Sequence, residues 1–177
     1  MGEMRKPEAW KSRLARELGR PKRLAVMGVG NVAKGDDGAG VFCAAALARL
    51  TAGLASPRLK IIPAGEAPEN FTGDVRKFGA THVVIVDVAA GGFPGGTVFL
   101  ADPRRIRDDD ASTHRLPLPL LAAYLEQTVG CRVILLGIEP KSFEPGAPLS
   151  AEVSRAAESA AAALAALSRR LLRSSSA

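Results

Sequence analysis

The sequence predicts one α/β domain: a three-layer fold with a mostly parallel, twisted sheet, helices on both faces and one antiparallel hairpin strand. Short, continuous apolar runs alternate along the chain with longer segments of helical spacing, and strands that are apolar throughout are typical of parallel sheets covered on both sides. The chain has 177 residues, 47% of them apolar, which is enough for one domain with a sizeable core. Because aromatic residues make up only 5%, aliphatic side chains must fill that core.

The predicted elements follow one another in a regular order. Buried strands are expected over residues 24–30, 59–62, 82–88 and 132–138. Helices are expected over residues 8–19, 38–53, 70–78, 117–129 and 150–172. The glycine-rich turn at 91–96 indicates that residues 97–100 return as the hairpin partner of the preceding strand. The first helix precedes the first strand and is expected to be an appendage.

The net charge of +6 resides at the two ends of the chain. Residues 1–23 carry a net charge of +5 and the tail from Arg169 carries +3, whereas residues 24–168 carry −2. We therefore divide the chain into a basic N-terminal extension (1–22), a main domain (23–172) and a flexible tail (173–177). Nucleic-acid binding is not expected, because it needs a basic face with stacking aromatics. A basic arm for an acidic protein partner, or solubility, explains the charge better.

Composition also bears on the compartment. No uninterrupted apolar stretch reaches the roughly 18 residues that a membrane span needs, and the N-terminus is charged throughout, without the apolar region of a signal peptide. We therefore expect no membrane span and a cytoplasmic protein. Cys43 and Cys131 lie far apart inside apolar segments and are expected to be buried structural thiols.

Acidic residues follow two of the predicted strands. Asp36 and Asp37 come after the first strand, and Asp87 ends the third. Parallel strands end at a common edge, and ligands bind there where the strand order reverses. If the first and third strands are neighbours, these acids meet, and His114, in the loop after the hairpin strand, could fold over the same edge. Two carboxylates and an imidazole suit a borderline divalent ion such as nickel or zinc.

Simpler explanations exist for each of these residues. Asp36 and Asp37 could cap the helix that follows them, Asp87 could bind loop amides, and His114 could lie on the surface. Residues 28–33, GVGNVA, fit a dinucleotide-binding fingerprint. However, the acidic pair would repel a pyrophosphate at the helix N-terminus, and no acid for a ribose follows the second strand. The common hydrolase motifs HExxH and GxSxG are absent from the sequence.

Several sequence blocks together resemble the nickel–iron hydrogenase maturation endopeptidases. They occupy residues 28–31 with 35–40, 65–70, 85–87, 112–118 and 136–140, and they occur in family order across roughly residues 24–165. The acidic pair and the run at 68–73, PENFTG, are most similar to the formate-hydrogenlyase type and its archaeal relatives.

The resemblance implies an endopeptidase that removes the C-terminal extension of a hydrogenase large-subunit precursor after nickel insertion. It places the metal-contacting, catalytic residues at Asp37, Asp87 and His114, with Asp36 as a cap that orients its neighbour. The nickel would be carried by the precursor, the expected partner, and no nucleotide cofactor is expected. Two alternatives stay open: a chaperone that binds the precursor without cleaving it, and a nucleotide-binding α/β protein.

Overall fold

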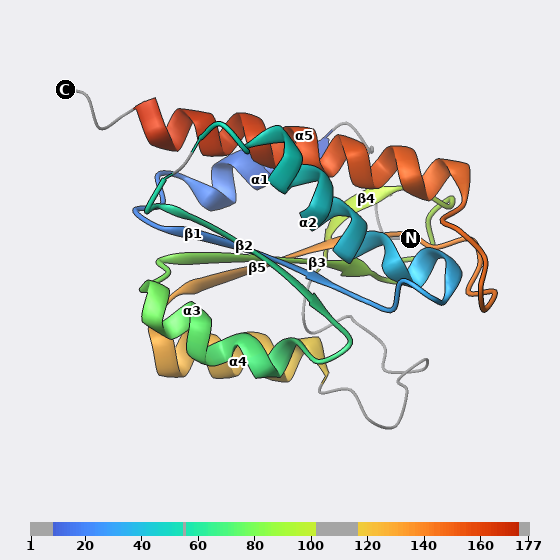
Figure 1. Cartoon of the computed structure of the whole chain (residues 1–177), viewed down its shortest axis with the longest axis horizontal. Helices are drawn as coiled ribbons and strands as arrows, with labels where there is room; N and C mark the ends of the chain where they lie inside the picture. The colour runs from blue at the N-terminus through green and yellow to red at the C-terminus, as the bar shows by residue number, and fades with distance from the viewer. Residues whose placement is uncertain (1–8, 55, 102–116, 174–177) are drawn as a thin grey trace, which may run out of the picture.

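The computed structural model describes residues 9–54, 56–101 and 117–173 (Figure 1). One sheet of five strands runs through the centre, in the order β2-β1-β3-β5-β4. The strands are β1 (Leu24–Val29), β2 (Leu59–Gly65), β3 (His82–Val88), β4 (Val98–Ala101) and β5 (Arg132–Ile138). All neighbouring pairs are parallel except β4 and β5, which are antiparallel. The predicted fold class is confirmed, and so is the neighbouring position of the first and third strands.

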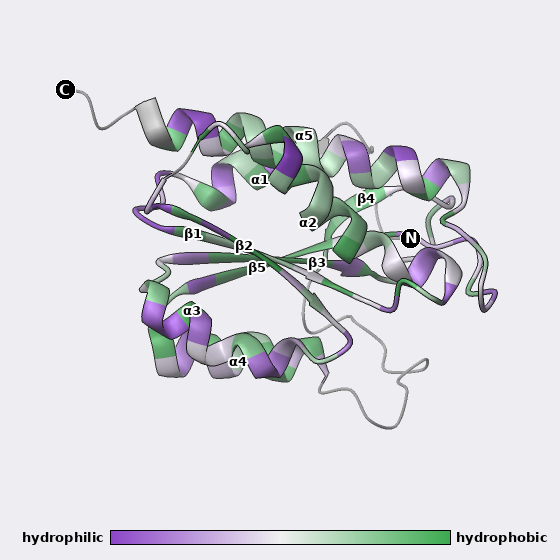
Figure 2. Cartoon of the chain, viewed as in Figure 1, coloured by the Kyte–Doolittle hydropathy of each residue, from purple (hydrophilic) through white to green (hydrophobic). Residues whose placement is uncertain are grey.

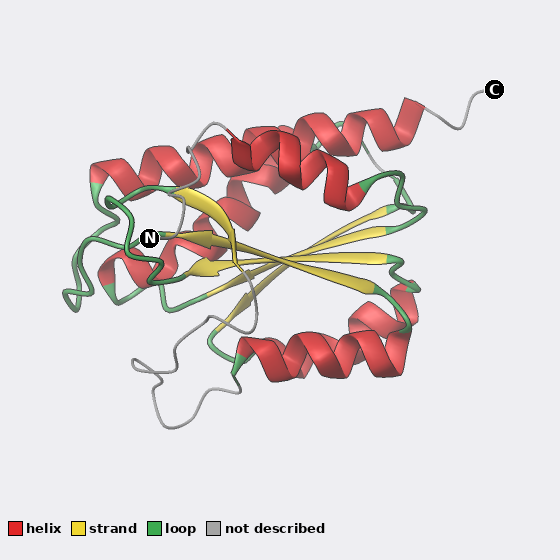
Figure 3. Cartoon of the chain, turned by 180° about the vertical axis from the view of Figure 1, so that it is seen from behind, coloured by secondary structure: helices red, strands yellow, loops and turns green. Residues whose placement is uncertain are grey.

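Helices cover both faces of this sheet. Figures 1 and 3 show α1 (Ala9–Leu18), α2 (Ala39–Leu50) and α5 (Ala151–Arg173) on one face, and α3 (Thr72–Phe78) and α4 (Leu118–Val129) on the other. Two short 3₁₀ helices, η1 (Gly35–Gly38) and η2 (Pro68–Phe71), precede α2 and α3. In Figure 2 the strands are largely hydrophobic in the middle of the sheet, and hydrophilic residues mark the outer sides of the helices. No helix in the described part of the chain is long and apolar enough to cross a membrane.

The core forms two clusters, one on each side of the sheet. Successive side chains of a strand point to opposite faces, so Leu24 and Val26 of β1 belong to the cluster under α2 and α5. Met27 and Val29 belong instead to the cluster under α3 and α4. In β3, Val84 and Val86 are in the first cluster and Val83 and Ile85 in the second. This alternation requires strands that are apolar at every position, which is the pattern that predicted them.

Two glycines allow α2 to begin directly on the sheet. A Cβ on Gly40 would lie 2.1 Å from the carbonyl oxygen of Val86 and 2.3 Å from that of Val29. A Cβ on Gly28 would lie 2.2 Å from the carbonyl oxygen of Gly40. Gly28, the first glycine of the dinucleotide-binding fingerprint, is thus explained by the close approach of α2 to β1.

Two expectations about the arrangement are wrong. The strand at 97–100 is antiparallel, but β4 pairs with β5, with Val98 opposite Ile138, and it is not a hairpin partner of β3. Because β3 is hydrogen-bonded to β1 and β5 on its two sides, it has no free edge for a hairpin partner, and β4 pairs with the outer side of β5. The first helix is not an appendage either: Leu14 and Leu18 of α1 are buried in the core cluster under α5. The division of the chain into an N-terminal extension (1–22), a main domain (23–172) and a tail (173–177) stays a prediction.

Candidate active site at the carboxyl edge of the sheet

The candidate site lies where the chain leaves β1 and β3. From β1 the chain passes through η1 and α2 to β2 on one side, and β3 lies on the other side of β1. The strand order therefore reverses between β1 and β3, and open parallel sheets bind ligands at such a point. In Figure 1 the arrowheads of β1, β2 and β3 point to the same edge of the molecule.

Gly30, directly after β1, joins the segments that make up this edge. Its N–H donates to the carbonyl oxygen of Gly65 at the end of β2, at 3.0 Å. With φ at +127° it adopts a conformation open mainly to glycine. A Cβ at this position would lie 1.7 Å from the carbonyl oxygen of Asp37 and 3.6 Å from Oδ1 of Asp87. The backbone of Asp37 and the carboxylate of Asp87 therefore meet over Gly30.

Asp37 lies in η1 and is partly buried. Its Oδ2 accepts a hydrogen bond from the backbone N–H of Asn31 at 2.8 Å, and the Asn31 side chain in turn accepts one from the N–H of Ala33 at 2.8 Å. The carboxylate is thereby attached to the loop that leaves β1. The capping explanation is wrong for both acids, since the N-cap residues of η1 and α2 are Lys34 and Gly38 and no side chain caps either helix.

Asp87 is the sixth residue of β3 and is 7% exposed. Its Oδ1 accepts a hydrogen bond from the N–H of Val88 at 2.8 Å. Strand alternation places its side chain on the face of Val83 and Ile85, which is the face that α3 and α4 cover. The Asp87 carboxylate is therefore at the carboxyl end of a central, otherwise apolar strand. Asp37 lies at the same edge of the sheet.

Asp36 has a different role from its neighbour. It is fully buried, and its carboxylate accepts hydrogen bonds from the N–H groups of Lys141 and Ser142, at 2.8 and 2.9 Å. Ser150 donates both its N–H, at 2.7 Å, and its hydroxyl, at 3.1 Å. Burial raises the pKa of Asp36, but these hydrogen bonds together outweigh it and hold the pKa below its ordinary value. The Asp36 carboxylate thus attaches the 141–150 loop to η1. Because Asp37 is the next residue of η1, these contacts also fix the position of its backbone.

Glu139, directly after β5, also lies at this edge and is not among the residues that the sequence predicts for the site. It is 8% exposed, and its Oε2 accepts a hydrogen bond from the N–H of Gly91 at 2.7 Å. Its backbone binds Gly96 and Thr97, at 2.8 and 2.9 Å. Glu139 therefore holds the glycine-rich 91–96 turn against the end of β5. This end of β5 is paired with the end of β3 that carries Asp87. Glu139 could have been identified from the sequence in the same way as Asp87, because it too is an acid at the end of an apolar strand.

The histidines divide between the described and the undescribed parts of the chain. His114 lies outside the described residues, so its predicted place beside Asp37 and Asp87 stays a prediction. Across the described ranges, no group of three or more histidine, cysteine, aspartate or glutamate side chains could hold a metal ion.

His82 begins β3, at the opposite end of the strand from Asp87. Burial and then the Arg132 charge lower the pKa of His82. Cys43 and Cys131 are buried, as expected.

Comparisons with known proteins identify relatives of this chain. Residues 44–167 match the hydrogenase maturation protease (HycI) family. A Methanocaldococcus jannaschii protein provisionally named a hydrogenase maturation protease is 33% identical over 147 residues, which cover 81% of this chain and 86% of that protein. The hydrogenase 3 maturation protease of Escherichia coli K12 is 36% identical over 113 residues, covering 63% of this chain and 69% of that protein.

The fold agrees with a solved structure. The crystal structure of the nickel–iron hydrogenase maturation protease HycI from Thermococcus kodakarensis superposes with a TM-score of 0.78 at 30% identity. The match covers 89% of this chain and 99% of that one. The family match spans more than half of the sequence and includes β2, β3 and β5. This chain is therefore a peptidase that belongs to the hydrogenase maturation protease family.

Proposed function

We propose that this peptidase removes the C-terminal extension of a nickel–iron hydrogenase large-subunit precursor after nickel has been inserted. In this proposal Asp37, Asp87 and His114 contact the nickel that the precursor carries. The observation that supports it best is that the backbone of Asp37 and the carboxylate of Asp87 both lie against Gly30, where a Cβ would be 1.7 Å from the carbonyl oxygen of Asp37 and 3.6 Å from Oδ1 of Asp87. These are two of the three positions that the motifs of the sequence assign to metal contact.

The chemistry follows from the nature of the ligands. Carboxylates and an imidazole suit a borderline divalent ion such as nickel. Each carboxylate is oriented by a backbone N–H, that of Asn31 for Asp37 and that of Val88 for Asp87, so neither has to be ordered when the substrate arrives. The nickel of the substrate would polarise the scissile carbonyl or a water molecule. In this proposal Asp37 or Asp87 would take the proton of that water.

Recognition of nickel would make cleavage depend on maturation. If part of the binding energy comes from contacts between this chain and the metal, a precursor without nickel docks less well and its reacting bond is not positioned. The protease itself then needs no tightly held ion. The precursor and its nickel are together the substrate.

A processing assay followed by mass spectrometry tests this proposal. Purified precursor, with and without nickel, is incubated with the wild type and with Asp37→Asn, Asp87→Asn and His114→Gln variants. We expect loss of one C-terminal peptide from the nickel-loaded precursor only, and a decrease in rate of about 100-fold or more in each variant, since metal contacts supply several kcal/mol. Asp74→Asn is the matched control, because Asp74 lies in α3 with a half-exposed side chain.

Three outcomes would contradict the proposal. Equal cleavage with and without nickel would remove the metal checkpoint. Full activity of the Asp37 and Asp87 variants would remove the assigned site. A stable complex in which the precursor stays intact in both states would favour the chaperone alternative.

A further inference from the structure

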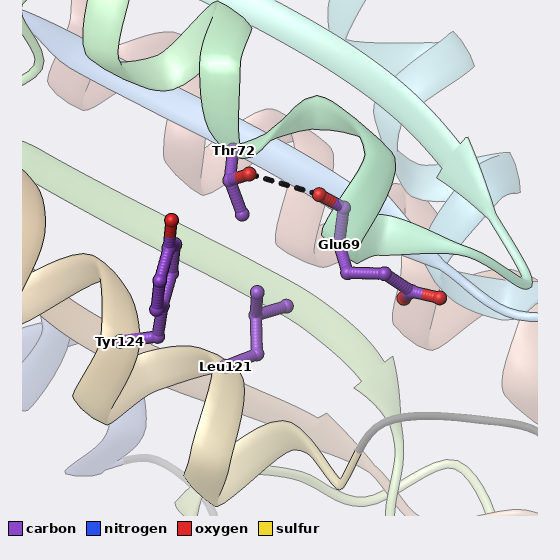
Figure 4. A pocket seen from close by; sticks show the side chains of 4 residues that line it. All are labelled: Glu69, Thr72, Leu121 and Tyr124. Carbon is purple, nitrogen blue, oxygen red and sulfur yellow. Dashed lines mark hydrogen bonds between the residues drawn. The ribbon is translucent and has the colours of Figure 1, made fainter.

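A cavity of about 250 Å³ lies between the η2–α3 segment and α4. Glu69, Thr72, Leu121 and Tyr124 line it (Figure 4). In Figure 4 the side chains of Leu121 and Tyr124 extend from α4 toward η2 and α3. The hydroxyl of Thr72 donates a hydrogen bond to the carbonyl oxygen of Glu69 at 2.9 Å, which fixes the turn that carries Glu69. The site proposed above uses none of these four residues.

The carboxylate of Glu69 is the unusual feature of this cavity. Its Oε2 is buried and has no hydrogen-bond partner, which is true of no other side-chain nitrogen or oxygen in the part of the chain that the structure describes. A buried, unpaired carboxylate oxygen is costly, so a positively charged hydrogen-bond donor would bind it favourably. The contrast with Asp36, whose carboxylate accepts four hydrogen bonds, shows how this fold treats a purely structural acid.

The cavity is on the same side of the sheet as Asp87. The core cluster under α3 and α4 contains Val83, Ile85 and Leu121, and strand alternation places Asp87 on the face of Val83 and Ile85. In Figure 4 the Glu69 carboxylate lies at the end of the cavity away from Tyr124, on the side toward which the arrowheads of the strands point. Four residues before it, Gly65 accepts the N–H of Gly30, the residue over which Asp37 and Asp87 meet.

The other walls suit a long aliphatic chain. Leu121 is fully buried and gives the cavity an apolar side, whereas Tyr124 is 44% exposed and presents its ring. The guanidinium of Arg76 donates to the Tyr124 hydroxyl at 3.4 Å. Among the described residues this is the one positively charged group that contacts a side chain lining the cavity. It lies at the Tyr124 end, away from the Glu69 carboxylate. An apolar wall, an aromatic ring and one carboxylate match the methylene stem and charged end of lysine or arginine.

We propose that this cavity is a subsite of the protease for a lysine or arginine side chain of its protein substrate, with Glu69 binding the charged end. The proposal rests on the proposed function. The methylene stem would pack between Leu121 and Tyr124, while the ammonium or guanidinium group donates to Oε2 of Glu69. Glu69 is then a specificity-determining residue that contacts substrate beside the reacting centre without taking part in the proton transfers.

A direct binding measurement tests the subsite without any cleavage. Nα-acetyl-arginine amide is titrated into the isotope-labelled full chain, and Nα-acetyl-citrulline amide, which has nearly the same shape but no charge, is the matched ligand. We expect saturable NMR shift changes at residues 69, 72, 121 and 124 with the arginine compound, and at least tenfold weaker binding of the citrulline compound. Glu69→Gln should remove this preference. Glu66→Gln, which removes an exposed charge from the same segment, should keep it. Equal binding of both compounds, or none at these residues, would overturn the proposal.

A processing measurement separates this inference from the function on which it rests. Each lysine and arginine near the cleaved bond of the nickel-loaded precursor is replaced by methionine in turn. We expect one replacement to slow the wild-type enzyme about tenfold through KM and to leave the Glu69→Gln variant unaffected. Cleavage that no replacement changes would refute the subsite and leave the protease function intact. A wild type that cleaves nothing would refute the proposed function, while the binding measurement still decides the subsite.

Discussion

Ser150 donates both its backbone N–H and its hydroxyl to the buried carboxylate of Asp36, at 2.7 and 3.1 Å. The two residues are 114 positions apart in the sequence. Ser150 directly precedes α5, and Asp36 lies in η1, which leads into α2. This contact joins the beginnings of the two helices that pack on the same face of the sheet, and it holds in place the turn that presents Asp37.

Replacing Asp36 by asparagine should destabilise the protein strongly. All four of its partners are donors, so whichever way the amide is oriented, its NH₂ group faces at least one N–H. We expect the free energy of unfolding, measured with urea, to fall by about 2–4 kcal/mol. Asp74→Asn, which removes only an exposed ion pair with Lys60, should cost less than about 1 kcal/mol. Equal losses in the two variants would show that the Asp36 contacts contribute nothing special.

The same residue should make stability depend on pH in the acid range. Hydrogen bonding holds the pKa of Asp36 in the folded protein below the ordinary value of 3.8, despite burial. A lowered pKa stabilises the fold above that ordinary value, and the contribution disappears as the pH falls through the folded pKa. The stability difference between wild type and Asp36→Asn should therefore be constant from about pH 7 to pH 5 and shrink below pH 3.8. Urea unfolding at a series of pH values measures it, and a difference unchanged at the lowest pH would contradict the assignment.

Gly40→Ala should disrupt the contact between α2 and the sheet. The added methyl would lie 2.1 Å and 2.3 Å from two carbonyl oxygens of the central strands, and neither can move without breaking the sheet. We expect a loss of about 2 kcal/mol or more in the free energy of unfolding. Gly73→Ala is the control: it is also the second residue of a helix, and its Cβ would meet nothing within 4 Å. That variant should be slightly more stable, since alanine favours helices. A harmless Gly40→Ala would mean that the helix can shift.

The two thiols should be inert in the folded protein. Burial raises the pKa of Cys43 to about 12, and burial also raises the pKa of Cys131. Since the thiolate is the reactive form, neither should react with a disulfide reagent such as Ellman's at about pH 8. In denaturant both should react, giving two thiols per chain. Rapid reaction of one thiol in the native protein would show that its segment opens readily.

Much of this fold could be predicted from local patterns. Strands buried on both faces must be apolar at every position, so β1, β3 and β5 are visible in the sequence. The second strand was predicted to end at residue 62, before Pro63, but β2 continues to Gly65. It lies at the edge of the sheet, paired only with β1, where a proline lacking an N–H is tolerated. The sequence leaves the neighbouring position of β1 and β3 as a supposition, which the structure confirms. Asp37 and Asp87 can be recognised from the sequence because acids at the ends of apolar strands stand out.

The sequence by itself determined the order of elements, the family and two acids of the candidate site, because periodicity and motifs are properties of neighbouring residues. Only the tertiary structure decided what depends on distant partners. It paired β4 with β5, buried Leu14 and Leu18 of α1, and gave Asp36 a partner 114 residues away in place of a helix cap. It likewise left one oxygen of Glu69 buried and unpaired. Whether a carboxylate is satisfied depends on which donors the fold brings to it, and no local pattern encodes that.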